Sequence, residues 1–323
     1  MNIADIEAAA ARLAGHAVRT PLLNAPLLDM QFGRRIFVKA ECLQKTGSFK
    51  YRGARSAISA LSPALRAKGV VAFSSGNHAQ GVACAAAELD VRAVIVMPAD
   101  APVLKIENTR AYVAEVILYD REKEDRDVIG AELADARGLT LIKPFDNELV
   151  IAGQGTTGLE IAEQAAEAGI EDADVLVCCG GGGLTSGIAV ALADRTPSFR
   201  VRPVEPEGFD DVSRSLAAGT RQTNNRLGGS ICDAILTPSP GVLTFPLLKA
   251  HCDAGLVISD NEALHAMAIA MQRLKITLEP GGAAALAAAL FRIEDDRDVI
   301  VTASGGNVDP AMLRRALAMH ITA

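Results

Sequence analysis

Short apolar runs alternate with longer amphipathic or alanine-rich segments along the whole chain. Each apolar run is short and bounded by turn residues, which is typical of a buried strand. Strands are expected at 36–40, 70–73, 93–97, 116–119, 139–143, 174–179, 199–205, 256–258 and 298–302. Helices are expected between them at 3–13, 54–61, 102–112, 120–136, 151–168 and 260–273. This alternation predicts an α/β fold with parallel strand pairing and right-handed crossovers.

Polar, glycine-containing turns follow several of these predicted strands. The turns lie at 74–78, 180–187 and 303–307. In open parallel sheets, ligands bind beyond the carboxyl ends of the strands. We therefore expect these turns to line a common binding site.

Lys50 stands where the apolar run 36–40 gives way to a helix-like segment, directly after Ser48 and the aromatic Phe49. A lysine at a strand-to-helix junction can be held out of bulk water, which disfavours its charged form. The resulting amine is a nucleophile that can form a Schiff base. The alternative is a surface lysine at a helix start, which is the more frequent case for a single motif.

Four consecutive glycines, Gly180, Gly181, Gly182 and Gly183, connect a buried strand to a helix. Their bare backbone can surround a phosphate at the positive end of that helix. The run has neither the Gly-Lys-Ser/Thr ending of a Walker loop nor a well-formed dinucleotide pattern, so a lone phosphate is the better ligand. The alternative is close packing of helix on sheet, which also needs glycine.

The turn at 74–78 offers hydroxyls, main-chain amides at a helix start and a carboxamide. Its residues are Ser74, Ser75, Gly76, Asn77 and His78. Such groups suit a carboxylate and a phenolic oxygen, whereas the alternative is an ordinary helix N-cap with its neighbours.

Composition narrows the function classes. The net charge of -7 provides no basic field for a nucleic-acid backbone. The six cysteines show no metal-ligand spacing, so we interpret them as structural thiols. The N-terminus lacks a secretion signal and no window has the apolar length of a membrane span, so a cytoplasmic protein is expected.

Jointly, these motifs resemble the fold-type II pyridoxal 5'-phosphate enzymes, specifically the threonine dehydratase and serine racemase group. The resemblance rests on 48–50, 74–78, the tetraglycine loop and 304–307, and it covers essentially the whole chain. It implies a tryptophan synthase β-like fold with two open parallel-sheet domains and the active site in the cleft between them. The large domain is expected at 1–53 and 147–323, with a small inserted domain at 54–146.

The resemblance also implies roles for individual residues. Lys50 would form the internal aldimine with pyridoxal phosphate, beside Phe49. The cofactor would further be held by Asn77 at its phenolic oxygen, by Gly180, Gly181, Gly182, Gly183 and Leu184 at its phosphate, and by Ser304 at its pyridine nitrogen. Serine is too weak an acid to keep the pyridine protonated, which favours β-elimination over fully developed quinonoid chemistry.

The substrate carboxylate would lie against the turn at 74–78. Its residues Ser74, Ser75, Gly76, Asn77 and His78 are the implied substrate contacts. Ser75 is also the catalytic candidate for proton delivery on the face opposite Lys50, as in racemases. Geometry decides whether it acts in this way.

A second resemblance concerns the acidic segment 205–211. In several members of the group this segment binds a divalent cation, here through Glu205, Asp211 and the main-chain carbonyl of Phe209. Hard oxygen ligands suit Mg²⁺ or Ca²⁺. The alternative is a solvated acidic loop.

The predicted function is dehydration of L-threonine or L-serine to a 2-keto acid and ammonia by α,β-elimination. The alternatives are a 3-hydroxyaspartate dehydratase, a serine or amino-acid racemase that uses Lys50 and Ser75, and a non-catalytic sensor that binds pyridoxal phosphate. A dicarboxylic substrate would call for an extra cation in the site. Arg121 and Arg126 lie near the position where some relatives place such an arginine. The favoured interpretation of these two residues is a solvated helix face. The resemblance also implies a homodimer.

Overall fold

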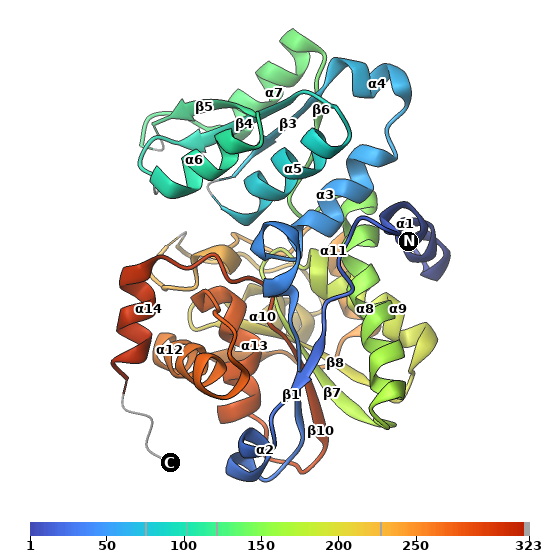
Figure 1. The fold of residues 1–323 in the computed structure, drawn as a ribbon, viewed down its shortest axis with the longest axis vertical. Helices are drawn as coiled ribbons and strands as arrows, with labels where there is room; N and C mark the ends of the chain where they lie inside the picture. The colour runs from blue at the N-terminus through green and yellow to red at the C-terminus, as the bar shows by residue number, and fades with distance from the viewer. Residues whose placement is uncertain (75, 102, 121, 227, 320–323) are drawn as a thin grey trace.

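Two sheets organise the computed structural model, which describes residues 1–74, 76–101, 103–120, 122–226 and 228–319. A six-stranded sheet has the order β1-β2-β10-β7-β8-β9, and a four-stranded sheet has the order β5-β4-β3-β6. The four-stranded sheet lies in the upper part of Figure 1 and the six-stranded sheet in the lower part. This arrangement confirms the predicted α/β fold with two parallel-sheet domains.

Both sheets are parallel except at one edge strand of the large sheet. The large sheet contains β1 (Leu22–Asn24), β2 (Ile36–Lys39), β10 (Asp298–Thr302), β7 (Ala173–Cys178), β8 (Arg200–Pro206) and β9 (Leu256–Ile258). The small sheet contains β5 (Glu115–Tyr119), β4 (Ala93–Pro98), β3 (Val70–Phe73) and β6 (Thr140–Leu141). The edge strand β1 is antiparallel to β2, and the other strand pairs are parallel.

Helices connect the strands and cover the sheets. They are α1 (Ile3–Leu13), α2 (Pro26–Phe32), α3 (Lys50–Ser59), α4 (Pro63–Lys68), α5 (Asn77–Glu88), α6 (Val103–Ala111), α7 (Arg126–Arg137), α8 (Glu148–Glu167), α9 (Gly183–Arg195), α10 (Asp211–Ala218), α11 (Thr244–His251), α12 (Asp260–Ile269), α13 (Pro280–Phe291) and α14 (Pro310–Leu317). Short 3₁₀ turns are η1 (Glu41–Leu43), η2 (Lys45–Gly47) and η3 (Asp233–Ile235), and η4 (Ala270–Leu274) is a π-helical turn.

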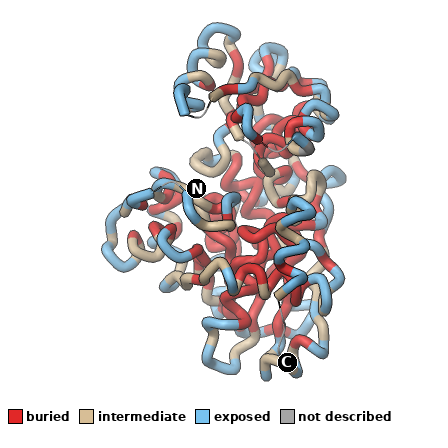
Figure 2. The backbone as a smooth tube through the Cα atoms, turned by 90° about the vertical axis from the view of Figure 1, so that its left-hand side faces the viewer, coloured by how far each residue is buried: buried red, intermediate tan, exposed pale blue. Residues whose placement is uncertain are grey.

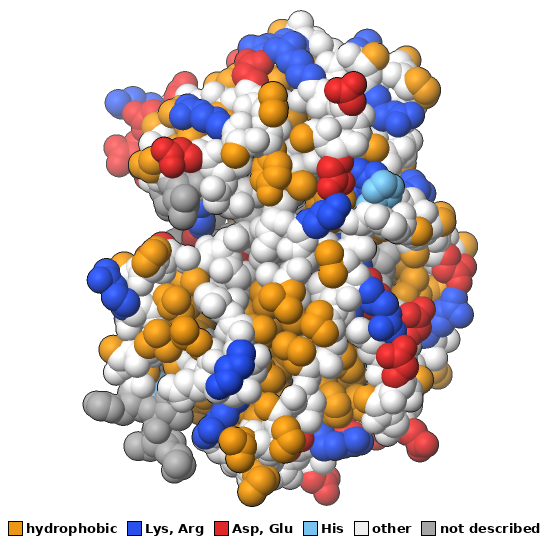
Figure 3. All heavy atoms as spheres, in the orientation of Figure 1, with side chains coloured by type: hydrophobic (Ala, Val, Ile, Leu, Met, Phe, Trp, Pro, Cys, Tyr) orange, Lys and Arg blue, Asp and Glu red, His pale blue; other side chains and the backbone are white. Residues whose placement is uncertain are grey.

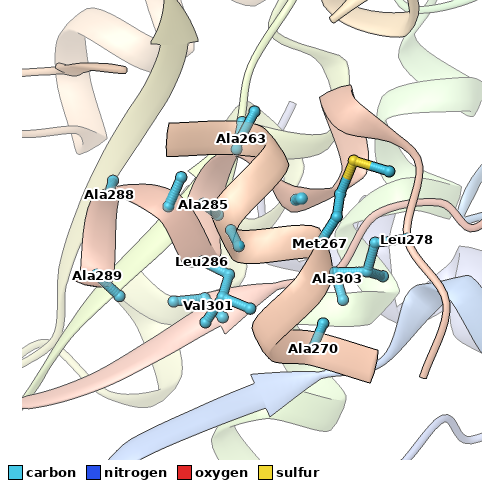
Figure 4. Packing of buried hydrophobic residues seen from close by; sticks show 14 of the residues in the cluster. Ala263, Met267, Ala270, Leu278, Ala285, Leu286, Ala288, Ala289, Val301 and Ala303 are labelled. Carbon is cyan, nitrogen blue, oxygen red and sulfur yellow. The ribbon is translucent and has the colours of Figure 1, made fainter. Parts of the chain in front are cut away.

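Alternate residues of the central strands point to opposite faces of the large sheet. Val175 and Val177 of β7 pack in the cluster that includes residues of α8 and α9. Leu176 packs on the other side, with α12 and α13. Figure 2 shows the resulting buried interior, and Figure 4 shows how the alanines of α13, among them Ala285, bring that helix close to β10. Both faces are covered, as a parallel sheet requires.

The small sheet follows the same alternation. Val70 and Ala72 of β3 pack with α3 and α5, whereas Val71 and Phe73 pack against the α7 side. The carboxyl ends of β3 and of β7 therefore carry their following turns toward the space between the sheets. Figure 3 shows the surface indented between the two parts of the molecule.

Several element boundaries differ from the expectation. The helix predicted at 120–136 begins only at Arg126, because the carboxylates of Asp120 and Glu124 accept hydrogen bonds from main-chain amides of this segment. Glu122 N–H donates to Asp120 Oδ1 at 3.0 Å, and Asp120 N–H donates to Glu124 Oε2 at 2.7 Å. The predicted strand at 139–143 is reduced to Thr140–Leu141. The predicted domain boundaries stay predictions, and α3 spans the one at 53/54.

Two further features of the chain are compatible with the sequence analysis. All six cysteines are free thiols. Among the described residues, no helix is both long enough and apolar enough to cross a membrane.

Candidate active site

A cavity of about 190 Å³ lies between the two sheets. The large-sheet side contributes the glycine loop before α9 and Ser304 after β10, and the small-sheet side contributes Phe73 and the turn after β3. The structure thus brings together most of the predicted site residues, namely Phe49, Lys50, Ser74, Gly76, Asn77, His78, Gly180, Gly181, Gly182, Gly183, Leu184 and Ser304. Ser75 lies outside the described residues.

Lys50 is the first residue of α3, and its amine is held inside the cavity. Nζ donates to the main-chain oxygen of Pro144 at 3.0 Å and lies 5.0 Å from the centre of the Phe49 ring. Burial lowers the pKa of Lys50 to about 8, because water no longer solvates the ammonium; the negative charge of Glu279 opposes this shift. Roughly a tenth of the amine is therefore neutral at pH 7, far more than for a solvated lysine.

The start of α9 forms an anion-binding cradle. Gly182 is its N-cap with φ of 91°, a left-handed conformation that favours glycine. The first amides of a helix have no acceptor within the helix. Thr185 Oγ1 is buried and lacks a partner among the described residues, as does Gln154 Oε1. Free amides and a free hydroxyl at the positive helix end fit the phosphate of pyridoxal phosphate.

The start of α5 provides a second set of amides on the other side of the cavity. Gly76 is the N-cap, and its N–H donates to Ser74 Oγ at 3.2 Å. Burial lowers the pKa of His78 to about 3, so its ring is neutral. His78 Nε2 lies 2.8 Å from the Ile142 carbonyl, an acceptor, so this nitrogen carries the proton. The main-chain amide of His78, and not its ring, is thus the donor available for a carboxylate.

Sequence reasoning missed several residues of the cavity wall: Lys105, Gln154, Thr185, Asp233 and Glu279. Thr185 had a detectable signal, since it follows the glycine loop at a helix start. The others come from segments with no motif of their own. Glu279 is 3% exposed, and burial raises its pKa to about 7.

Two cationic side chains lie on the small-sheet side. Lys105 of α6 and Arg126 of α7 both line the cavity, and the Arg126 guanidinium stacks over the Phe73 ring at 5.6 Å. Arg126 is exposed, as expected of a solvated helix face, yet it also reaches the cavity. Arg121 lies outside the described residues.

The predicted metal ligands lie outside this cavity, between β8 and α10. Burial and the neighbouring charge of Asp211 raise the pKa of Glu205 to about 8, and burial raises that of Asp211 to about 6. Asp211 Oδ2 is buried and unpartnered within the described ranges. Those ranges hold no group of three His, Cys, Asp or Glu side chains placed to share an ion. Two carboxylates with an orphaned oxygen fit a divalent cation that takes its remaining ligands from carbonyl and water.

Comparisons with known proteins agree with this geometry. A family model described as pyridoxal-phosphate dependent enzyme matches residues 13–307. The chain is 44% identical over 307 residues to an L-threo-3-hydroxyaspartate ammonia-lyase of Pseudomonas sp, covering 94% of this chain and 95% of that protein. It is 40% identical to a serine racemase of Schizosaccharomyces pombe, covering 94% of each chain.

The solved structure of a T.th. threonine deaminase has a similar fold. It superposes with a TM-score of 0.90 at 44% identity and covers 96% of this chain and 99% of that chain. The matches extend over nearly the whole sequence and include both walls of the cavity. The chain is therefore a member of the family of pyridoxal-phosphate dependent enzymes, of fold type II, together with ammonia-lyases and serine racemases.

Proposed function

We propose that this protein is an ammonia-lyase that converts a β-hydroxy amino acid to a 2-keto acid and ammonia. The observation that carries the proposal is a half-buried Lys50 with a pKa of about 8 in a cavity with a helix-start cradle on each side. Bound pyridoxal phosphate supplies the electron sink that allows a β-hydroxyl group to leave after loss of the α-proton.

Each cradle has a distinct task in this proposal. The amides of Gly180, Gly181, Gly182, Gly183 and Leu184, with the Thr185 hydroxyl, hold the cofactor phosphate. Asn77 contacts its phenolic oxygen and Ser304 its pyridine nitrogen. Ser74 and the amides at the start of α5 orient the substrate carboxylate. Lys50 takes the α-proton, because its lowered pKa leaves a neutral amine near physiological pH.

The charges of the small-sheet wall favour a substrate with a second carboxylate. Lys105 and Arg126 both line this wall, and the curated hydroxyaspartate ammonia-lyase shares 44% identity with the chain. We propose 3-hydroxyaspartate ahead of L-threonine and L-serine, the substrates that the sequence analysis put first. The 44% identity to a threonine deaminase keeps L-threonine and L-serine as second candidates.

A divalent cation, Mg²⁺ or Ca²⁺, would be held by Glu205, Asp211 and the carbonyl of Phe209. The orphaned Oδ2 of Asp211 and the raised pKa values of both carboxyls support this assignment, because a cation would relieve their burial and mutual repulsion. We also propose a homodimer, carried over from the resemblance, and the cytoplasmic location expected in the sequence analysis.

The test is release of keto acid and ammonia by cofactor-loaded protein from the 3-hydroxyaspartate isomers, L-threonine and L-serine. Turnover of 3-hydroxyaspartate with the highest kcat/KM is expected. A higher kcat/KM for L-threonine or L-serine would reverse the substrate order and keep the reaction class. Inversion of an amino acid without ammonia would identify a racemase, and cofactor binding without any product would identify a sensor.

A further inference from the structure

A run of hydrogen bonds crosses the cavity wall and passes through the carboxamide of Asn77. Asn307 Nδ2 donates to the main-chain oxygen of Thr46 at 2.8 Å and to Asn77 Oδ1 at 2.7 Å. Asn77 Nδ2 in turn donates to Glu279 Oε1. These four residues lie far apart in the sequence, so the run forms only in the folded chain.

Above the pKa of Glu279, both ends of the run can only accept a hydrogen bond. The Thr46 carbonyl carries no proton, and the Glu279 carboxylate carries none once the pH exceeds its pKa of about 7. The Thr46 carbonyl can therefore accept a hydrogen bond only from Nδ2 of Asn307, and the second N–H of that amide then donates to Oδ1 of Asn77. Independently, the Glu279 carboxylate can accept only from Nδ2 of Asn77. The two ends thus enforce the same orientation of the Asn77 amide, and its second N–H remains for a group in the cavity that Asn77 lines.

Two glycines pack closely against the run. A side chain at Gly305 would overlap the Glu279 carboxylate, and a Cβ at Gly47 would lie 2.6 Å from Asn307 Oδ1. Glu279 occupies the N-cap position of α13, yet its side chain makes no capping hydrogen bond. Its carboxylate thus contacts Asn77 instead of serving its own helix.

We propose that Glu279 and Asn307 are positioning residues that hold Asn77 with its Nδ2, and not its Oδ1, toward the phenolic oxygen of the cofactor. The inference rests on the proposed contact of Asn77 with that oxygen. An N–H donor stabilises the oxygen as a phenolate, whereas a carbonyl oxygen in its place favours the neutral phenol. Because either end alone enforces the orientation, both must be removed to release it.

The experiment measures the absorbance spectrum of the cofactor-loaded protein. The ratio of the visible band to the shorter-wavelength band reports how much of the cofactor has an ionised phenolic oxygen. Glu279→Met, of similar size and without an acceptor, and Asn307→Ala are expected to lower this ratio by no more than about twofold each. The double variant is expected to lower it by about tenfold, because each lost hydrogen bond removes one constraint on the same amide. A double variant equal to the product of the singles would overturn the inference.

Two further variants test the orientation directly. Glu279→Gln offers a donor as well as an acceptor, so it no longer enforces one orientation, and its combination with Asn307→Ala is expected to lower the ratio as Glu279→Met does in the same background. Glu279→Gln combined with Asn307→Asp places a carboxylate that can accept only from Nδ2 of Asn77 opposite an amide that can donate to its Oδ1, so this combination is expected to reverse the Asn77 amide and to lower the ratio further. An unchanged ratio in both combinations would overturn the inference, and they serve where Glu279→Met does not fold.

Controls separate this inference from the proposed function. Asp233→Asn removes another carboxylate of the cavity wall without touching Asn77, so a matching spectral change there would show a general charge effect and overturn the positioning role. Asn77→Asp replaces the donor itself. If Asn77→Asp leaves the spectrum unchanged, the proposed contact of Asn77 fails; if it changes the spectrum and the double variant does not, only the positioning role fails.

Discussion

The two walls of the cavity are built in different ways. On the large-sheet wall, an added Cβ at Gly182 would lie 2.7 Å from Leu248, and one at Gly183 would lie 2.6 Å from Gln154 Oε1. On the small-sheet wall, a Cβ at Gly76 would meet only the end of the Lys105 side chain, at 3.9 Å. The glycine loop of the first wall is closely packed, whereas the second wall also carries two long cationic side chains, Lys105 and Arg126.

This difference separates the chemistry from the choice of substrate. In the proposed function, main-chain amides fixed by glycine packing would bind the cofactor phosphate, which every substrate would share. Long cationic side chains such as Arg126 can be exchanged without repacking a core, so substrate preference can change while the cofactor site stays intact. Changes in the glycine loop of the large-sheet wall should therefore affect all substrates alike, and changes to Lys105 and Arg126 on the small-sheet wall should affect their ratios.

Loss of Lys50 tests the large-sheet wall most severely. Lys50→Ala removes the only amine proposed to take the α-proton, so kcat is expected to fall by about 10⁴-fold for every substrate. The visible absorbance of the bound cofactor should be lost as well. Lys45→Ala is the matched control, since Lys45 lies in the same segment but is paired with Glu88 at 2.6 Å. Retained absorbance in Lys50→Ala would contradict the role of this lysine.

The pH dependence of cofactor loading tests the same amine without mutation. Only the neutral amine attacks the cofactor aldehyde, and Lys50 has a pKa of about 8. The loading rate of apoprotein should rise with pH, level above about pH 8, and be lower by about 100-fold at pH 6. Glu279, with a pKa of about 7, loses its charge over the same range. Protonation of Glu279 removes a negative charge that stabilises the Lys50 ammonium, so the loading rate decreases less steeply toward low pH. A midpoint near the pKa of a solvated lysine would show that the site is not desolvated.

The sequence predicted the parts of this site that depend on local patterns. Lys50, the glycine loop and the turn at 74–78 each follow a strand-like run, and a turn after a strand of a parallel sheet faces the ligand side. Thr185 could have been added by the same reasoning. Period-two alternation was not needed, because strands such as β7 are buried on both faces and, apart from Asp174, are apolar.

The sequence could not predict contacts between distant segments. Glu279 meets Asn77 across 202 residues, and nothing in its own segment indicates a role other than the start of α13. Arg126 lies in a charged segment whose pattern fits a solvated helix, and only the late start of α7 places it over Phe73. Such contacts depend on how the two sheets are set against each other, which short-range patterns do not specify.

A side chain in the glycine loop should weaken cofactor binding for all substrates equally. In Gly181→Ala the new Cβ would overlap the Phe145 ring, so the ring must shift. Overpacking of about 1–3 kcal/mol is expected, which corresponds to a roughly tenfold to hundredfold higher Kd for pyridoxal phosphate. Gly228→Ala is the matched control because nothing lies within 4 Å of its added Cβ. An altered ratio between substrates in cofactor-saturated Gly181→Ala would contradict the division between the two walls.

Loss of either cation of the small-sheet wall should change the substrate ratio. Arg126→Ala and Lys105→Ala are each expected to lower kcat/KM for 3-hydroxyaspartate about fivefold relative to L-serine, because a partly exposed ion pair contributes about 1 kcal/mol. Arg110→Ala removes an exposed charge from the same helix as Lys105 and should leave the ratio unchanged. An equal decrease of kcat/KM for both substrates would indicate that these side chains contribute to cofactor binding instead.

The metal site gives the smallest expected effect and tests how far the large-sheet wall extends. Asn224 Nδ2 donates to Asp211 Oδ1 at 2.6 Å and to the main-chain oxygen of Thr237, a cavity residue, at 2.8 Å. Saturating Mg²⁺ is expected to raise Tm by about 5 °C by binding only the folded state. Glu205→Gln should abolish this shift in Tm, whereas Glu207→Gln, which changes an exposed carboxylate of the same segment, should retain it.

Since Asn224 connects the metal site to the large-sheet wall, Mg²⁺ should leave the ratio of 3-hydroxyaspartate to L-serine turnover unchanged. A ratio that follows Mg²⁺ would mean that the cation acts on the substrate side as well, and the two walls would not be separate.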